Sequence, residues 1–347
     1  MSKLIKAGIV GATGYTGIEL VKILINHKKV KISELTSESY SNMPLSNIEK
    51  EFNKYKLPTL KKNKYLNAAD LDIVFVALPH IESQKFISKI IDKVKIIDLS
   101  GDFRLKKIQD YKKWYSKKHL LKNRIKDFVY GLPEINRRKI INSNNISVPG
   151  CYPTSVLLPL LPIIQKNLLN KNNIIIDSKS GYSGAGKKFN LKKLIKNKNY
   201  NFYNYNPNSH RHIPEIEQEI FFFSNKKIKI SFNPHILPIK RGIISSIYCE
   251  LKKNVTPNLI QKILSSFYKK NKFIKIIKNN NISLFDVIGT NNCLINIAKN
   301  NIKNTIIIQT AIDNLLKGAS GQAVQNMNLM FNFNEYEGLQ NIKFNNE

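Results

Sequence analysis

A glycine-rich loop between a short apolar strand and a helix restricts the fold of this chain more than any other feature. The loop reads GATGYTG over residues 11–17, after an apolar strand pattern at 6–10 and before a helical pattern at 18–26. Glycines at such a junction permit a tight turn and let a pyrophosphate approach the backbone, while the N–H groups of the helix start face the anion. The pattern favours a dinucleotide site, and a glycine turn without a ligand is the alternative. The predicted cofactor contacts of the loop are Gly11, Thr13, Gly14, Tyr15, Thr16 and Gly17.

The segments after the loop alternate between apolar strands and helices. Strands are predicted at 30–36, 71–78 and 94–99, with a helix at 83–91 between the last two. This alternation is typical of βαβ units around a parallel sheet. After Pro149, strands are predicted at 174–178, 227–232, 243–251 and 294–298, with helices at 155–164, 257–268 and 314–331. The sequence therefore predicts an α/β protein with a Rossmann-type domain followed by a second domain with a mixed sheet. Residues 187–204 are predicted to be a loop.

The residue usage limits the class of protein. The chain of 347 residues is long enough for two domains, and no apolar run approaches the ~18–20 residues of a membrane span. Its start does not resemble a signal peptide. The three cysteines, Cys151, Cys249 and Cys293, have neither a disulfide pattern nor metal-ligand spacing. We expect a reduced, cytoplasmic protein that neither enters a membrane nor holds a metal.

The positive charge has two interpretations. Lys and Arg number 56 against 24 Asp and Glu, but only six of the 56 are Arg. The excess of Lys accompanies a surplus of Asn and Ile, which share A/T-rich codons, so genome composition explains it without a binding surface. A basic nucleic-acid-binding protein is the alternative from another functional class. Only residues 187–205 combine Lys with aromatic residues as that alternative requires, and we expect no nucleic-acid partner.

Cys151 lies in the most informative stretch, SVPGCYPT at 147–154. Pro and Gly before it predict a sharp turn, and the apolar run at 155–164 predicts a helix, so Cys151 precedes a helix N-terminus. The helix dipole there stabilises a thiolate and lowers the pKa of the thiol. We predict that Cys151 is a nucleophile. Cys249 and Cys293 are within or beside strand patterns and are interpreted as small buried hydrophobes.

A cysteine nucleophile needs an acid/base partner, and the segment HRHIPEIEQ at 210–218 offers one. His212 is predicted to be the acid/base, with Glu215 holding the tautomer of its imidazole. A solvated loop before a helix is the alternative, with the glutamates favouring the first helical turn. The other histidines, His27, His80, His119 and His235, receive no catalytic role.

Two arginines and one further loop suit substrate binding. Arg104 closes the segment DLSGDFR at the end of a buried strand, and Arg241 lies in PIKRG. Either guanidinium could hold a phosphate or carboxylate through two hydrogen bonds, and a surface ion pair is the alternative for both. The loop SGYSGAG at 180–186 lets a flat ligand approach the backbone; within it, Ser180 is predicted to contact substrate or phosphate and Gly184 the cofactor.

The choice between NAD and NADP is left open by the residues after the second strand. An acidic residue there binds the ribose of NAD, and a basic residue favours NADP. Ser37 and Ser39 could donate to a 2′-phosphate, whereas Glu38 would repel one if it pointed inward.

A dinucleotide loop, a thiolate and an acid/base histidine suggest one chemistry: attack on an activated acyl group and reduction of the resulting thioester by a nicotinamide. The chain resembles the N-acetyl-gamma-glutamyl-phosphate reductase family of arginine biosynthesis over nearly its whole length. The shared motifs are GATGYTG, DLSGDFR, YGLPE, VPGCYPT, SGYSGAG, HRHIPEIEQ, DNLLKGASGQAVQNMN and a closing EYEGL. The HRHxPE motif separates this family from the related aspartate-semialdehyde dehydrogenases.

The resemblance implies reduction of N-acetyl-L-glutamyl 5-phosphate by NADPH to the 5-semialdehyde and phosphate. It carries the nucleophile onto Cys151, the acid/base onto His212 and a partner role onto Glu215. By analogy with the related enzymes Arg104 would bind phosphate, and Asn326 in the C-terminal motif is expected to contact the cofactor. The family also implies a homodimer or homotetramer and a C-terminal helix that returns to the cofactor domain. The expected domains are 1–150 with 314–347, which bind NADP, and 151–313, which carries catalysis and oligomerisation.

Two departures from the family pattern matter. Many members carry a basic residue near the position of Glu38, so the expectation of NADP depends on the family. Pro159 and Pro162 lie inside the helix after Cys151, which predicts a kinked or short helix. Reductases of aminoadipyl phosphate or aspartyl phosphate are the nearest enzymatic alternatives.

Overall fold

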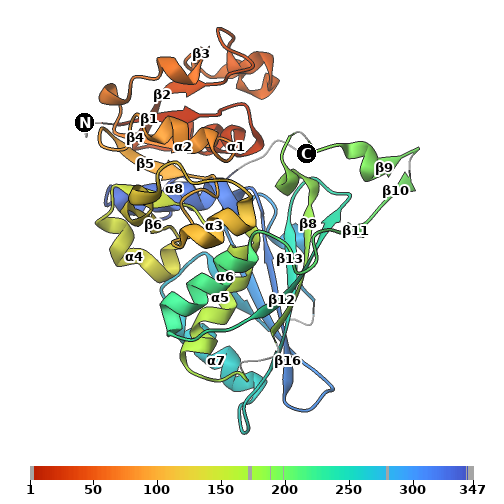
Figure 1. The fold of residues 1–347 in the computed structure, drawn as a ribbon. Coiled ribbons are helices and arrows are strands. Elements are labelled where there is room, and N and C mark those ends of the chain that lie inside the picture. Colours follow the sequence, from red (N-terminus) through yellow and green to blue (C-terminus); the bar gives the residue numbers. More distant parts are fainter. Residues whose placement is uncertain are drawn as a thin grey trace. The chain divides into compact units, whose positions relative to one another are not determined.

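The computed structural model describes residues 4–170, 174–187, 189–197, 199–278, 281–340 and 342. The chain divides into two compact units, Met1–Pro149 with Ala319–Glu347, and Gly150–Gly318. The first unit contains a parallel seven-stranded sheet and the second a mixed seven-stranded sheet, with helices packed in both (Figure 1). The predicted α/β fold class is confirmed.

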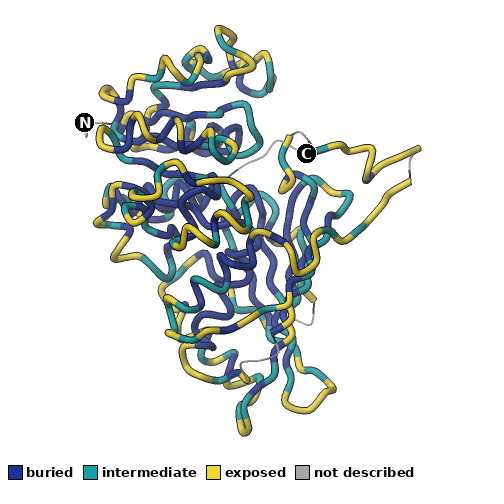
Figure 2. The backbone as a smooth tube through the Cα atoms, viewed as in Figure 1, coloured by how far each residue is buried: buried dark blue, intermediate teal, exposed yellow. Residues whose placement is uncertain are grey.

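The sheet of the first unit has the order β3-β2-β1-β4-β5-β7-β6, and all its pairs are parallel. Its strands are β1 Ile5–Val10, β2 Val30–Thr36, β3 Leu60–Lys61, β4 Ile73–Val76, β5 Lys95–Asp98, β6 Phe128–Tyr130 and β7 Asn145–Ser147. Its helices are α1 Tyr15–Leu24, α2 Glu82–Ile87, α3 Ile108–Tyr115, α4 Pro133–Ile141 and α8 Gly321–Met330. All of β4 is buried, as expected for a parallel strand with both faces covered (Figure 2). From β1 the chain first adds β2 and β3 on one side of the sheet and then β4 and β5 on the other, so the switch point lies between β1 and β4. Ligands of such sheets bind at this switch point.

The C-terminal helix α8 packs within the first unit. Ser320 Oγ donates to the carbonyl of Thr16 at 2.8 Å, and Asn326 Nδ2 donates to the carbonyl of Gly131 at 2.9 Å. The helix predicted over 314–331 is in fact a π-helical turn at Leu316–Ser320 followed by α8. Of the predicted C-terminal segment, residues 341 and 343–347 lie outside the described residues.

The sheet of the second unit has the order β11-β12-β8-β13-β16-β15-β14, with β12/β8 and β14/β15 parallel and the other pairs antiparallel. Its strands are β8 Ile174–Gly181, β11 Tyr203–Asn204, β12 Ile230–Leu237, β13 Ile243–Glu250, β14 Ile274–Ile277, β15 Cys293–Lys299 and β16 Thr305–Ile312. Helices α5 Cys151–Gln165, α6 Ile213–Ser224 and α7 Pro257–Phe267 pack against it. Burial alternates along β8 and β13, so one side of each strand faces the core and the other is more open.

Helix α5 runs through both prolines, so the expectation of a short helix is wrong, and the expected kink stays a prediction. It spans 15 residues, and Pro159 and Pro162 lie inside it. Pro162 cannot donate to the carbonyl of Leu158, four residues earlier. The hydroxyl of Tyr268 donates to that carbonyl instead, at 2.5 Å. A side chain from the segment after α7 therefore replaces one backbone hydrogen bond that proline removes.

The predicted loop at 187–204 contains short strands. Strands β9 Ile195–Lys196 and β10 Asn199–Tyr200 pair with each other, and β11 pairs with the edge strand β12. Residues 188 and 198 of this segment lie outside the described residues. The Lys- and Asn-rich composition hid these strands, since two-residue pairings leave no periodicity to detect.

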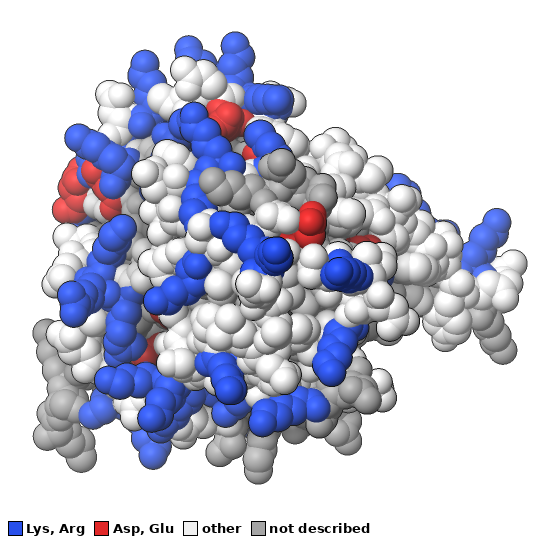
Figure 3. Space-filling view, turned by 90° about the horizontal axis from the view of Figure 1, so that it is seen from below, with Lys and Arg blue, Asp and Glu red and all other residues white. Residues whose placement is uncertain are grey.

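Lysine and arginine side chains are scattered over the face drawn in Figure 3 rather than gathered in one stripe. Within the described residues, no helix is both long and apolar enough to span a membrane.

Candidate active site

The glycine loop has a backbone that only glycine can supply at two positions. Gly11 has a φ of +81°, and a Cβ added there would lie 2.4 Å from the carbonyl oxygen of Ala77. A Cβ at Gly17 would lie 2.3 Å from the carbonyl oxygen of Gly11. The first and third glycines therefore close the loop tightly against β4 and the start of α1.

The space in front of α1 suits an anion. Gly14 is the N-cap of this ten-residue helix and has no side chain to cap it, while a Cβ there would meet only the Gly11 carbonyl, at 3.5 Å. The first-turn N–H groups of a helix lack intrahelical acceptors, and no acidic residue lies in the first turn of α1. These features fit a pyrophosphate at the helix N-terminus.

The segment after β2 is held close to this loop. The hydroxyls of Thr13 and Ser37 are 2.9 Å apart, and Ser37 is buried. Glu38 and Ser39 are exposed, and Glu38 Oε1 accepts from the backbone N–H of Asn63 at 2.9 Å. The predicted contacts of Ser37 and Ser39 with a 2′-phosphate stay predictions.

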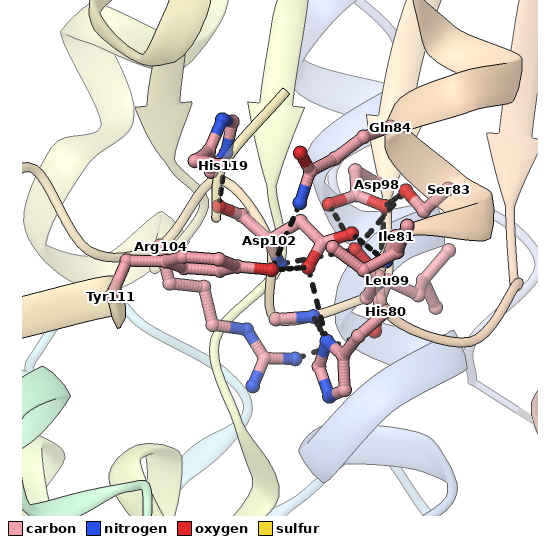
Figure 4. Close-up of polar contacts among 12 residues, drawn as sticks. His80, Ile81, Ser83, Gln84, Asp98, Leu99, Asp102, Arg104, Tyr111 and His119 are labelled. Atoms are coloured by element: carbon pink, nitrogen blue, oxygen red, sulfur yellow. Dashed lines mark hydrogen bonds and ion pairs between the residues drawn. The ribbon is translucent and has the colours of Figure 1, made fainter. Parts of the chain in front are cut away.

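Arg104 lies at the carboxyl ends of β5 and β7 and is 8% exposed. Its Nε donates to the carbonyl of Val148 at 2.8 Å. Its Nη2 donates to the carbonyl of Leu99 at 3.3 Å (Figure 4). These two bonds fix the guanidinium where ligands of parallel sheets bind. Its role in phosphate binding stays a prediction.

A buried polar network beside Arg104 was not predicted from the sequence (Figure 4). Asp102 accepts from Tyr111 Oη at 2.6 Å and from the backbone N–H of Ile81 at 2.8 Å, and it lies 3.3 Å from His80 Nδ1. Burial would raise the pKa of Asp102, but the hydrogen bonds from His80 and Tyr111 outweigh burial and lower it. For Asp98, burial and then the charge of Asp102 raise the pKa to about 7. The available signal was an aspartate at the end of a buried strand, Asp98, with a second one four residues later.

Cys151 is the first residue of α5, and His212 is the N-cap of α6. A Cβ added to Gly150 would lie 2.5 Å from His212 Nε2, so the imidazole lies against the glycine that precedes Cys151. Gly318 is equally confined, since a Cβ there would lie 2.8 Å from that of Cys151. The fold therefore brings the predicted nucleophile and the predicted acid/base together.

Glu215 joins the two helix starts. The backbone N–H of Gly150 donates to Glu215 Oε1 at 2.8 Å, and this carboxylate is 1% exposed. The bond ties the first turn of α6 to the N-cap of α5. The predicted pairing of Glu215 with the imidazole of His212 stays a prediction.

The side chain of His210 is hydrogen-bonded to the backbone of His212. Its Nδ1 accepts from the backbone N–H of His212 at 3.1 Å, so its ring proton is on Nε2. Burial, and secondarily the charge of Arg211, lower the pKa of His210 to about 4. The aromatic rings around it belong to Tyr152, Tyr205 and Phe232, at centroid distances of 5.4–5.6 Å. A neutral, enclosed imidazole is a structural support, which the sequence did not distinguish from a catalytic one.

Ser180 lies near the end of β8, and Arg241 lies in the loop between β12 and β13. The backbone N–H of Gly181 donates to the carbonyl of Gly242 at 2.8 Å, and Ser180 is 3% exposed. Arg241 Nε lies 3.3 Å from Asp313 Oδ2, and both side chains are buried. Asp313, which the sequence analysis did not single out, balances the charge of Arg241. Gly184 is exposed on the turn η6 Tyr182–Ala185.

Asn326 in α8 has one unused hydrogen-bonding atom. Its Nδ2 donates to the carbonyls of Gly131 and Gln322, at 2.9 and 2.8 Å. Its Oδ1 is buried and has no hydrogen-bond partner among the described residues. A buried acceptor without a donor is costly, and a ligand amide would remove that cost.

In the part of the chain that the structure describes, no three His, Cys, Asp or Glu residues are grouped to hold a metal ion. Cys249 and Cys293 are buried, and burial raises the pKa of Cys249 to about 12.

Comparisons with known proteins match two successive parts of the chain to two family models. Residues 6–143 match the family model described as the semialdehyde dehydrogenase NAD-binding domain, and residues 151–314 match the one described as the semialdehyde dehydrogenase dimerisation domain. An N-acetyl-gamma-glutamyl-phosphate reductase of Clostridium botulinum (strain Eklund 17B / Type B) is 44% identical over 342 residues, which cover 98% of this chain and 99% of the relative. One of Ehrlichia ruminantium (strain Gardel) is 44% identical over 352 residues, covering 99% and 100%.

Solved structures share the fold at low identity. Aspartate semialdehyde dehydrogenase II from Vibrio cholerae has a TM-score of 0.72 at 18% identity and covers 95% of this chain and 99% of its own. Aspartate semialdehyde dehydrogenase with NADP from Candida albicans has a TM-score of 0.71 at 13% identity, with the same coverage.

Proposed function

Because the chain belongs to the N-acetyl-gamma-glutamyl-phosphate reductase family, we propose that it reduces N-acetyl-L-glutamyl 5-phosphate with NADPH. The products are N-acetyl-L-glutamate 5-semialdehyde and phosphate, in a step of arginine biosynthesis. The observation that carries the proposal is the position of His212 Nε2 against Gly150, directly before Cys151 at the start of α5. A nucleophile and an acid/base meet there at a helix end that stabilises negative charge.

The side chains of this site perform the acyl transfer. His212 accepts the proton of Cys151, and the thiolate attacks the acyl carbon of the substrate. The carbon–oxygen bond to phosphate breaks, the leaving phosphate takes the proton from His212, and a thioester forms on Cys151. When bound, NADPH would supply a hydride to the thioester carbon. Cys151 leaves as a thiolate when the aldehyde forms, and it takes up a proton from water. Glu215 keeps the two helix starts together through the Gly150 amide.

The first unit supplies the groups proposed to bind the cofactor. The glycine loop and the N-terminus of α1 receive the pyrophosphate, and Ser37 and Ser39 lie on the adenosine side. The unpartnered Oδ1 of Asn326 is proposed to accept from the nicotinamide carboxamide. In the second unit, Gly184 is proposed to contact the cofactor, and Ser180 and Arg241 the substrate.

Self-association is proposed to use the more open face of the second unit's sheet. Apolar side chains on it include Ile175 at 49% and Tyr248 at 38% exposure, on adjacent strands β8 and β13. Such a face favours association between copies of the chain. A homodimer or homotetramer is proposed, and light scattering distinguishes them. The cytoplasmic location stays a prediction.

The reverse reaction tests the function. N-acetyl-L-glutamate 5-semialdehyde, phosphate and NADP⁺ are incubated with the protein and NADPH is followed by absorbance. Phosphate-dependent NADPH formation is expected. Turnover without phosphate would instead indicate a simple aldehyde dehydrogenase, and faster turnover of aspartate semialdehyde or the aminoadipate analogue would indicate a relative with another substrate.

The protein is expected to prefer NADP⁺ over NAD⁺. Ser37 and Ser39 can donate to a 2′-phosphate, and the carboxylate of Glu38 is bound to the Asn63 amide. The kcat/KM values for the two cofactors in the reverse assay provide the measurement. Equal values, or an NAD⁺ preference, would contradict the prediction and assign Glu38 to the ribose.

Arg104→Lys is expected to raise the KM for phosphate by about tenfold or more. Lys keeps the charge but cannot form two parallel hydrogen bonds to a phosphate. The substitution also removes the bonds to Val148 and Leu99, so thermal unfolding is measured in parallel. Arg138→Lys, at an exposed arginine of the same unit, is the matched control. A lower unfolding temperature with an unchanged KM for phosphate would make Arg104 structural.

A further inference from the structure

A cavity of about 420 Å³ lies in the first unit beside the end of β2. Its walls come from the segment that includes η3 Asn63–Tyr65 and η4 Ala68–Asp70, and from α2 and the residues after it. The apolar part of the wall includes Leu66, Phe86 and Ile90. The rest of the lining is polar or charged, and the volume is within the range of sites that hold small organic ligands.

The rim of this cavity is positively charged. It contains Lys64, Lys85, Lys89 and Lys93 against Glu38 and Glu82, a net formal charge of +2. Lys85 is paired with Glu82 at 2.8 Å, and Lys64 Nζ lies over the ring of Tyr65 at 4.8 Å. Among the described residues, Lys89 has no carboxylate partner. The rim therefore has positive charge left over to bind an anionic group.

The cavity is connected to the proposed cofactor loop through two neighbouring residues, Ser37 and Glu38. Glu38 lines it, and the preceding residue, Ser37, is bonded to Thr13 of the glycine loop. The carboxyl end of the second strand is where the adenosine ribose of a dinucleotide lies in this type of sheet. Serine hydroxyls carry no charge, so a doubly charged phosphate at this place is bound more strongly when cationic side chains are present in addition.

We propose that this cavity takes the adenosine end of the cofactor and that Lys64 and Lys89 select the 2′-phosphate. Lys64 follows Asn63, whose backbone N–H donates to the carboxylate of Glu38. The lysine is therefore next in sequence to the residue that binds the acidic group, which would otherwise repel the 2′-phosphate. Lys89 contributes unpaired charge from the opposite wall. The inference depends on the proposed function, because it assigns part of the same cofactor site.

Calorimetric titration with two fragments tests it: adenosine 2′,5′-bisphosphate, which carries the 2′-phosphate, and AMP, which lacks it. Lys64→Ala and Lys89→Ala are each expected to weaken bisphosphate binding about fivefold, the size of one exposed charge contact, and the double variant about 25-fold. AMP binding is expected to change less than twofold. Lys112→Ala, an exposed lysine of α3, removes the same charge and should change neither. The loss should shrink at high salt.

Glu38→Gln supplies a test of opposite sign. Removing this carboxylate is expected to strengthen bisphosphate binding and leave AMP unchanged. Weaker AMP binding with unchanged bisphosphate binding would place the ribose hydroxyl on Glu38 and overturn the proposal. An unchanged ratio of the two affinities in the lysine variants would also overturn it. If only this proposal fails, wild-type protein still binds NADP⁺. If wild-type protein binds neither NADP⁺ nor the bisphosphate, the proposed function fails as well.

Discussion

Cys151→Ser is expected to abolish turnover in both directions. A serine alkoxide forms far less readily than a thiolate, and an ester accepts hydride less readily than a thioester. Binding of NADP⁺ is expected to persist, because the glycine loop belongs to the other unit. The reverse assay measures turnover, and titration calorimetry measures NADP⁺ binding.

Cys249→Ser is the matched control for this substitution. Cys249 is 2% exposed in β13 and has no proposed chemistry, so its replacement should retain kcat and cost only stability. Substantial activity in Cys151→Ser would remove the covalent mechanism. Loss of activity in Cys249→Ser without a lower unfolding temperature would show that the assignment of the nucleophile is incomplete.

His212→Asn is expected to lower kcat about 10²–10⁴-fold, the usual contribution of a general acid/base. The substitution removes the imidazole that lies against Gly150 while keeping a small polar side chain at the N-cap of α6, so the fold should persist. Circular dichroism and thermal unfolding check the fold, and the reverse assay gives kcat.

The neighbouring histidine provides the comparison. His210→Asn is expected to cost less than tenfold, because the amide oxygen of Asn can accept from the His212 N–H in place of Nδ1. His210→Leu lacks an acceptor and should cost more, mainly through stability. A neutral imidazole with a pKa of about 4 supplies little acid at neutral pH. If His210→Asn proved more damaging than His212→Asn, the acid/base role would belong to His210.

The sequence predicted the elements whose signals are local. The glycine spacing at 11–17 and the apolar run after Cys151 each depend on neighbours within a few residues, and the structure places β1, α1 and α5 there. Strand β2 was predicted at 30–36, which is its observed span. The alternation of strand and helix patterns predicted the α/β fold, and the family resemblance supplied the identity of the substrate.

The prediction of a short α5 failed for a reason that lies far away in the chain. By the local rule, Pro159 and Pro162 should kink or break a helix that contains them. The rule is overridden because the hydroxyl of Tyr268, 110 residues from Leu158, donates to the carbonyl that Pro162 leaves unbonded. Nothing near the prolines in the sequence announces that partner.

The sequence by itself determined which residues can carry the chemistry: a cysteine at a helix start, a histidine before a second helix and a glycine loop before a third. Only the tertiary structure decided how His212, His210 and Glu215 are arranged around Gly150. Gly150 and Glu215 are 65 residues apart and meet at 2.8 Å, and the same contact region places His212 against Gly150. The physical reason is that hydrophobic period and glycine spacing set local backbone geometry, whereas the environment of a side chain depends on which distant helix ends pack together.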